Sequence, residues 1–205
     1  MAPTHAEDVG FEVWLASASP RRATLLAQLG LRTRQYPVDV DESVRPGEAP
    51  VDYVRRVTGM KLEAAASRLI HEQAGPSVPL LAADTAVVLD GESLGKPRDR
   101  AHALGMLRRL SGRAHQVFTH VAVGDRAGAV HQATSVTDVR FRPLDDGELA
   151  RYWEGGEPHG KAGAYAIQGL GAAFIERIDG SYSGVMGLPL FETVKLLAAV
   201  GVHVV

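Results

Sequence analysis

The sequence predicts a mixed α/β fold, in which a twisted sheet carries helices on its flanks. Short apolar runs of strand length alternate along the chain with helical patterns, and two long strand-like stretches follow each other near its middle, as in an antiparallel hairpin. With 205 residues, 45% of them hydrophobic, the chain is long enough for one or two compact lobes. We expect strands and helices from both ends of the chain to form one side of a cleft.

Strands are predicted where apolar runs end at turn residues. The run at 79–89 is interrupted by Asp84 and Thr85, so it is interpreted as two strands, 79–83 and 86–89. The other predicted strands span residues 13–16, 115–123, 129–141 and 172–178.

Helices are predicted where leucines, valines and alanines recur at helical spacing. The first begins at Ser19, which can cap it, has Pro20 at its first position and ends before Gly30. Asp99 is predicted to cap another helix. The predicted helices span residues 19–29, 50–70, 99–110, 145–153 and 188–200.

Composition excludes several classes of protein. A net charge of -2 argues against general nucleic-acid binding, and the absence of cysteine fits a reducing compartment. There is no apolar run long enough for a transmembrane helix, and the N-terminal residues lack the apolar stretch of a signal peptide. We therefore expect a soluble, cytoplasmic protein without membrane or nucleic-acid partners, made of a flexible tail over residues 1–12 and one domain over 13–205.

A phosphate-binding site is predicted at the start of the first helix. Ser17, Ser19, Arg21 and Arg22 surround this helix N-terminus, where free backbone N–H groups and the helix dipole favour an anion. Hydroxyl and guanidinium groups add charge-assisted hydrogen bonds. The same residues also fit a serine cap followed by solvated arginines, but two arginines in a first turn oppose the dipole, which favours a ligand.

Asp84 and Thr85, together with Lys96, form a second candidate site. An aspartate that ends an apolar strand can hold Mg²⁺ or take a proton from water, and a turn over residues 91–95 would return Lys96 to the same edge. The alternative is that Asp84 caps a turn and that Lys96 is an ordinary surface residue.

Two further groups complete the candidate residues. Lys161 and Gln168 lie in a glycine-rich segment, where the backbone can approach a ligand closely and glutamine offers both a donor and an acceptor to a base. This segment also fits an ordinary flexible loop. Glu42 and Lys61 are a weaker group, because Lys61 lies on the apolar side of its predicted helix and either covers the edge of the core or reaches into a cleft.

Other kinds of catalytic site lack their patterns. Residues 155–162 have the spacing of a P-loop but end in Ala162, where a hydroxyl should hold Mg²⁺. The eight histidines show no zinc-ligand spacing, and no serine lies in a G-x-S-x-G turn.

Four motifs, in this order, closely resemble those of the Maf family of nucleotide pyrophosphatases. They are L-A-S-A-S-P-R-R at 15–22, A-D-T at 83–85, G-K-P at 95–97 and K-A-G-A-Y-A-I-Q-G at 161–169. The likeness extends from about residue 13 to residue 197, nearly the whole chain. Two positions depart from the family pattern: Leu62 stands where alanine is usual, and Gly160 stands where some members have aspartate.

The resemblance implies a fold similar to that of inosine triphosphate pyrophosphatases, with two lobes around a deep cleft, and commonly a homodimer. It implies hydrolysis of nucleoside triphosphates to the monophosphate and pyrophosphate with a divalent cation, Mg²⁺ or Mn²⁺. With Gln168 in its Y-A-I-Q motif, the sequence resembles the branch of the family that prefers dTTP and UTP. The implied substrates also include modified or noncanonical pyrimidine nucleotides.

The resemblance also implies roles for the candidate residues. Asp84 is implied as general base or metal ligand, with Glu42 as a second acid and metal ligand and Lys96 as a further catalytic residue. Gln168 is implied to lie near the base. The implied substrate-binding residues are otherwise Ser17, Ser19, Arg21, Arg22, Lys61, Thr85 and Lys161.

Two other functions remain open at this point. The family is linked by its name to septum formation, so the chain could be a nucleotide-binding regulator of cell division in which hydrolysis is incidental. The other alternative is an inorganic pyrophosphatase or an enzyme that releases orthophosphate from triphosphates.

Overall fold

A computed structural model describes residues 10–72 and 78–204. The tail expected over residues 1–12 therefore lies, apart from its last three residues, outside the described residues. Phe11 packs edge-to-face on Trp14, and the Glu12 N–H donates to the carbonyl of Arg32.

One seven-stranded mixed sheet forms the centre of the protein. The strand order is β2-β1-β3-β5-β6-β7, with β4 paired to β3, and β1 runs parallel to β2 and β3 while the other pairs are antiparallel. The strands are β1 (Val13–Leu15), β2 (Thr33–Gln35), β3 (Leu80–Leu89), β4 (Glu92–Leu94), β5 (Ala114–Gly124), β6 (Val130–Phe141) and β7 (Ile175–Asp179). The mixed α/β prediction is confirmed.

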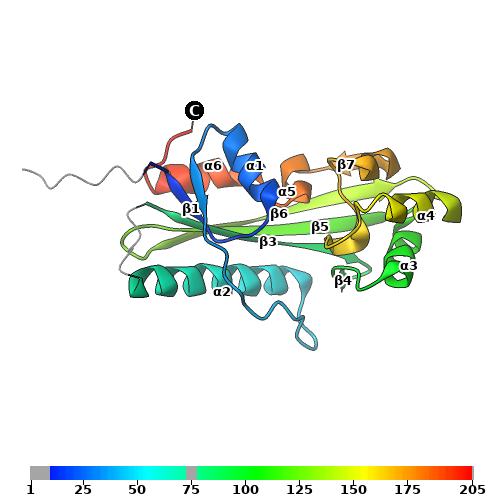
Figure 1. Ribbon diagram of the computed structural model, residues 1–205, viewed down its shortest axis with the longest axis horizontal. Coiled ribbons are helices and arrows are strands. Elements are labelled where there is room, and N and C mark those ends of the chain that lie inside the picture. Colours follow the sequence, from blue (N-terminus) through cyan, green and yellow to red (C-terminus); the bar gives the residue numbers. More distant parts are fainter. Residues whose placement is uncertain (1–9, 73–77, 205) are drawn as a thin grey trace, which may run out of the picture.

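Helices cover both faces of this sheet. The long helix α2 lies along one face, while α1, α5 and α6 lie on the other, and α3 and α4 pack together at the far end (Figure 1). The helices are α1 (Pro20–Gln28), α2 (Pro50–His71), α3 (Arg100–Leu110), α4 (Asp146–Glu154), α5 (Tyr182–Met186) and α6 (Leu190–Ala199), with 3-10 turns at Ala162–Ala164 and Leu170–Phe174. No helix in the described ranges is long and apolar enough to cross a membrane.

The helix ends follow their sequence signals with one exception. Asp99 accepts the hydrogen bond of the His102 N–H, as a capping residue should, and Gly30 ends α1 with a φ of 75°. Pro20 occupies the first turn of α1, but the side chain of Ser19 makes no capping hydrogen bond. Ser19 therefore occupies the N-cap position predicted for it, but without the side-chain hydrogen bond of a capping residue.

The main correction concerns β3, which runs unbroken through Asp84 and Thr85. β5 pairs with β3 at every position from Leu80 to Val88, so hydrogen bonds across the ladder hold the polar pair in extended conformation. The strand predicted at 172–178 also begins later, because Leu170–Phe174 forms a 3-10 turn. The elements β2, β4 and α5 were not predicted, since three to five residues carry too little periodicity.

The other edge of β3 contains a gap. β1 pairs with it only as far as Leu81, and β4 begins its pairing at Val87. Between these points no strand of the described chain covers that edge, so the backbone around Asp84 and Thr85 is open on one side. This gap positions the functional site.

Side-chain alternation along β3 separates the two polar residues. Asp84 points to the face covered by α2, in line with the buried Ala82, whereas Thr85 points to the opposite face. On that opposite face, Ala83 belongs to a hydrophobic cluster with residues of α1 and α6, while Val87 belongs to a second cluster with α3 and α4. Thr85 thus lies between two cores.

Candidate active site

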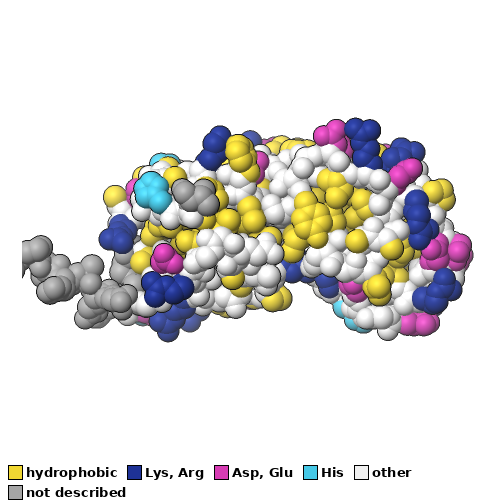
Figure 2. Space-filling view, turned by 90° about the horizontal axis from the view of Figure 1, so that it is seen from above, with side chains coloured by type: hydrophobic (Ala, Val, Ile, Leu, Met, Phe, Trp, Pro, Cys, Tyr) yellow, Lys and Arg dark blue, Asp and Glu magenta, His cyan; other side chains and the backbone are white. Residues whose placement is uncertain are grey.

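A cavity of about 550 Å³ lies at the gap in the sheet edge. Its walls come from the start of α1, from α2, β3 and β4, and from the segments 160–168 and 185–187. A space-filling view shows an indentation between the two ends of the molecule, with Lys or Arg atoms at its base (Figure 2).

The structure brings the predicted site residues together. Those that line the cavity are Ser19, Arg21, Arg22, Glu42, Lys61, Asp84, Thr85, Lys96, Lys161 and Gln168. Ser17 is the exception, since its hydroxyl accepts hydrogen bonds from the Arg22 Nη1 (3.1 Å) and the Ser19 N–H (3.1 Å) and does not line the cavity. All of the candidate residues except Ser17 therefore share one cavity.

Asp84, Lys61, Glu42 and Lys96 form a chain of ion pairs across the cavity. Lys61 Nζ lies 2.7 Å from Asp84 Oδ1 and 2.6 Å from Glu42 Oε1, and Lys96 Nζ lies 3.2 Å from Glu42 Oε2. The side chains of Lys61 and Asp84 are only 9% and 10% exposed, so their pairing is weakly screened by solvent. Lys61 therefore reaches into the cleft, which decides between the two interpretations of its position.

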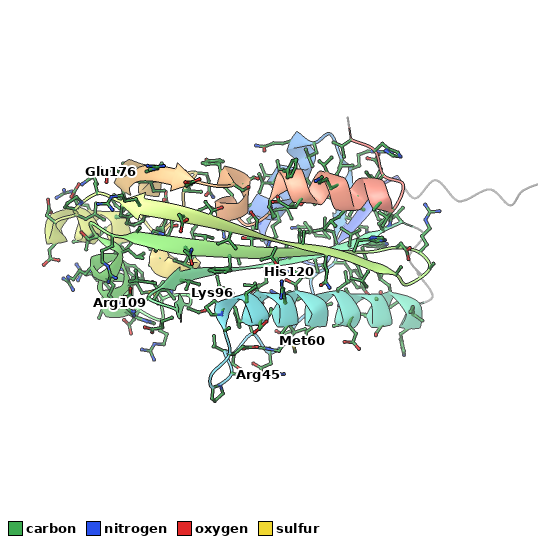
Figure 3. The ribbon with its side chains drawn as sticks, turned by 180° about the vertical axis from the view of Figure 1, so that it is seen from behind. Arg45, Met60, Lys96, Arg109, His120 and Glu176 are labelled. Atoms are coloured by element: carbon green, nitrogen blue, oxygen red, sulfur yellow. The ribbon has the colours of Figure 1, made fainter. Side chains whose placement is uncertain are left out.

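Glu42 lies on the connection between β2 and α2, and α2 holds this connection in place. The Tyr53 hydroxyl donates to the Glu42 carbonyl (3.1 Å), and Arg56 makes two hydrogen bonds to Glu48 and one to the Ser43 carbonyl. Burial raises the pKa of Glu42, but hydrogen bonds and positive charge from the two lysines outweigh this effect and lower it. Glu42 is thus held as a carboxylate. The same connection carries Arg45, and Lys96 lies near the adjacent end of α2 (Figure 3).

The guanidinium group of Arg22 makes most of its hydrogen bonds to other protein groups. Its guanidinium donates to the Gly187 carbonyl (2.8 Å), the Ser17 hydroxyl (3.1 Å) and the Thr85 hydroxyl (3.3 Å), and the residue is 8% exposed. The Thr85 hydroxyl in turn lies 3.0 Å from that of Thr119. Arg22 therefore ties the start of α1 to β3 and to the turn after α5.

Arg21 and Lys161 are less constrained. Arg21 Nε donates to the Met186 carbonyl (3.2 Å), and burial lowers its pKa. Burial, and then the positive charge of Arg21, lower the pKa of Lys161. Both cations are partly desolvated and close to each other, and Arg21 also lies in the first turn of α1, where the helix dipole disfavours positive charge. An anionic ligand would relieve these costs.

The segment 160–168 closes the other side of the cavity. The Gly163 N–H donates to the Gly95 carbonyl (3.1 Å), and Gly163 has a φ of 67° with Val87 so close that a Cβ would lie 2.9 Å from its Cγ1. Gln168 is exposed at the cavity, and its amide makes no hydrogen bond to the described residues. The amide is free to contact a ligand.

Sequence reasoning missed several residues of this site. Tyr53 lines the cavity and lies two turns before Lys61 on α2, so helical spacing from Lys61 could have found it. The carbonyls of Met186 and Gly187, which hold the two arginines, carry no sequence signal because any residue has a carbonyl group.

The fold and the cleft define an α/β protein with a site suited to a polyanion next to two carboxylates. The chain belongs to the family described as Maf-like protein, which it matches over residues 12–200.

Individual relatives give the same assignment. The dTTP/UTP pyrophosphatase of Bordetella parapertussis is 53% identical over 196 residues, covering 94% of each chain. That of Nitrosomonas europaea is 52% identical over 200 residues, covering 94% of this chain and 96% of the relative. Among solved structures, the Staphylococcus aureus Ham1 protein matches 63% of this chain and 71% of its own, with a TM-score of 0.45 and 16% identity.

Proposed function

We propose that this chain hydrolyses nucleoside triphosphates, with dTTP and UTP preferred and modified pyrimidine nucleotides included, to the monophosphate and pyrophosphate. The observation that carries this proposal is the convergence of five cationic side chains on Asp84 and Glu42 in one cavity. The names of the relatives, which are 53% and 52% identical, support the same reaction and substrates.

The cationic groups fit a triphosphate. The triphosphate group carries about four negative charges, so several cations are needed to offset its repulsion of an incoming hydroxide. Arg21, Lys96 and Lys161 are the ones with donors left free by the protein's own contacts, and we assign them to the phosphates. Lys61 and Arg22 also line the cavity, but most of their donors already hold protein groups. Ser19 and Thr85 add hydroxyls, and Ser17 acts through Arg22.

Asp84 is assigned to the attacking water. Its Oδ1 accepts from Lys61, whereas no described residue donates to its Oδ2. In this assignment, Oδ2 takes the proton of a water molecule that attacks the α-phosphate, and pyrophosphate leaves as the bond to the β-phosphate breaks.

The two carboxylates fit a divalent cation such as Mg²⁺ or Mn²⁺. The described residues contain no cluster of three or more His, Cys, Asp or Glu that could hold a metal by themselves. Mg²⁺ in nucleotide enzymes characteristically takes only one or two carboxylates and completes its shell with phosphate oxygens and water. Asp84 and Glu42 would hold it, and the ion would supply charge neutralisation and a more acidic water.

Base selection is assigned to Gln168. Its free amide at the cavity presents one acceptor and two donors, which is the complement that a pyrimidine edge requires. A homodimer, a cytoplasmic location and the absence of nucleic-acid partners remain predictions.

A panel of nucleotides tests this function. The purified protein is incubated with Mg²⁺ and with dTTP, UTP, CTP, purine triphosphates, modified pyrimidines and a methylated guanine nucleotide, and the products are identified. We expect monophosphate and pyrophosphate, fastest from dTTP and UTP. Orthophosphate with a diphosphate would contradict the assigned bond cleavage, and no product from any nucleotide would favour the regulator of cell division.

The role of Asp84 is tested by Asp84→Asn. The amide keeps the shape but does not take a proton, so we expect pyrophosphate release to fall by about 10²-fold or more. Nucleotide binding, measured by calorimetry, should remain, because Arg21, Lys96 and Lys161 are unchanged. Turnover equal to that of the wild type would reject the assignment.

A further inference from the structure

Glu157 follows α4 in the chain, and its carboxylate accepts three hydrogen bonds. The Tyr152 hydroxyl donates to Oε1 (2.7 Å), the Gly171 N–H donates to Oε1 (2.9 Å) and the Leu170 N–H donates to Oε2 (2.8 Å). Glu157 is not among the residues that line the cavity. Its hydrogen bonds hold the backbone of residues 166–171, the segment that carries Gln168.

These hydrogen bonds hold the backbone on both sides of Gln168. On the C-terminal side, the carboxylate binds the N–H groups of Leu170 and Gly171 directly. On the N-terminal side, the Ala166 N–H donates to the Tyr152 hydroxyl (3.1 Å), which itself donates to Glu157. One carboxylate therefore fixes both ends of this short segment.

The backbone of Glu157 also contacts Lys161, one of the cationic residues that line the cavity. Lys161 Nζ donates to the Glu157 backbone carbonyl at 2.5 Å. The side chain and the backbone of one residue thus place two groups of the cavity wall, Lys161 and the segment around Gln168.

The packing leaves room for the carboxylate only because glycines surround it. A Cβ on Gly169 would overlap the Glu157 carboxylate, and one on Gly171 would lie 2.6 Å from the Ala166 carbonyl and 2.7 Å from the Tyr152 hydroxyl. Two of the glycines in this segment are therefore required by the Glu157 contacts and not by flexibility.

A charged acceptor suits this place better than an amide. An ionised carboxylate offers acceptors alone to the three donors, whereas glutamine would turn N–H groups toward some of them. Burial raises the pKa of Glu157, but the hydrogen bonds from Tyr152, Gly171 and Leu170 outweigh it and lower the pKa below its ordinary value.

We propose that Glu157 is a positioning residue that sets nucleotide selectivity by fixing the backbone of the segment that presents Gln168. The Gln168 amide has no hydrogen-bond partner among the described residues, so its place in the cavity depends on its backbone. A held amide distinguishes UTP from CTP, whose bases exchange donors and acceptors, whereas a loose one accommodates both. This inference rests on the proposed function.

The first test measures kcat and KM for UTP and CTP with Glu157→Ala and Glu157→Gln. We expect KM for UTP to rise about tenfold or more, because one hydrogen bond to a charged group already corresponds to roughly a tenfold change in an equilibrium constant. The preference for UTP over CTP should shrink, while kcat changes less than KM. Glu154→Ala is the matched control, since Glu154 is exposed at the end of α4 and its side chain makes no hydrogen bond to the described residues.

The second test displaces the carboxylate without removing it. Gly169→Ala should reproduce the loss of selectivity seen in Glu157→Ala, and the double variant should be little worse than either single variant, since both remove the same contacts. Additive losses, or folded Glu157 variants with unchanged selectivity, would overturn the proposal.

Hydrogen exchange separates this inference from the proposed function. Amides of residues 166–171 should exchange faster in Glu157→Ala than in the wild type and in Glu154→Ala, with the strands of the sheet unaffected. If the wild-type protein hydrolyses no nucleotide, the proposed function fails, yet this measurement still tests whether Glu157 holds the segment. Unchanged exchange in a folded Glu157→Ala protein would refute the positioning role.

Discussion

Arg21 and Arg22 are neighbours in sequence, but their guanidinium groups are used differently. The buried guanidinium of Arg22 donates to Gly187, Ser17 and Thr85. That of Arg21 faces the cavity and, among the described residues, makes one hydrogen bond, to the Met186 carbonyl. The sequence predicts both as phosphate ligands because the pattern places them in the same helical turn. The structure favours a direct role for Arg21 and a structural role for Arg22.

Alanine substitutions should separate these roles. Arg21→Ala should raise KM for dTTP about tenfold while leaving thermal stability unchanged, since it removes a contact to substrate. Arg22→Ala should lower the free energy of unfolding by about 2–4 kcal/mol, because it leaves buried acceptors without donors. Nucleotide kinetics and chemical denaturation measure the two effects, and equal stability of both variants would contradict the division.

At the scale of elements, α2 supports the two carboxylates that line the cavity, those of Asp84 and Glu42. Lys61 on this helix contacts Asp84, and Arg56 and Tyr53 hold the connection that carries Glu42. Arg56 and Glu48 are 14% and 9% exposed, so their ion pair is better shielded than one on the open surface. The helix thus aligns two acids that come from different parts of the chain.

Removal of the Arg56 side-chain charge should disturb this alignment. Arg56→Met frees Glu48 and the Ser43 carbonyl, so we expect kcat/KM to fall about tenfold as Glu42 loses its fixed position. Arg55→Met is the control, since Arg55 is the exposed neighbour and makes no ion pair in the described chain. A similar loss in both variants would point to a general effect of charge instead.

For the whole molecule, most of the long elements and the cavity residues could be predicted from the sequence. Long elements carry periodicity, and the site motifs combine chemistry with family spacing. The unbroken β3 could not be predicted, because Asp84 and Thr85 look like a turn until β5 is known to pair with them. Glu157 was not identified as a site residue for a similar reason, since its partners at Leu170 and Gly171 are backbone groups.

At the scale of the whole fold, we expect His115 to make stability depend on pH. Its Nε2 lies 2.9 Å from the Tyr165 hydroxyl, its Nδ1 is buried without a partner in the described chain, and burial lowers its pKa to about 4. As pH falls below about 6.5, His115 takes up a proton in the unfolded chain, whereas in the folded protein it does so only near pH 4. The free energy of unfolding therefore decreases across this interval.

Chemical denaturation at pH 7 and pH 4.5, compared with His115→Gln, isolates this contribution. The wild type should lose on the order of 2–3 kcal/mol more than the variant over this range, because only the wild type has the imidazole of His115. His120 remains in both proteins and cancels in the difference. Identical pH dependence of the two proteins would show that folding does not shift the pKa of His115.

The opening between β1 and β4 has a consequence for how this scaffold can diversify. Because the cavity penetrates the rim of the sheet, with Asp84 toward one side and Thr85 toward the other, its width is set by where two short neighbouring strands stop. Lengthening or trimming those strands by a residue should resize the entrance, while pairing with β5 keeps Asp84 in place. We therefore expect changes at these strand ends to alter the range of substrates without moving the carboxylate to which the chemistry is assigned.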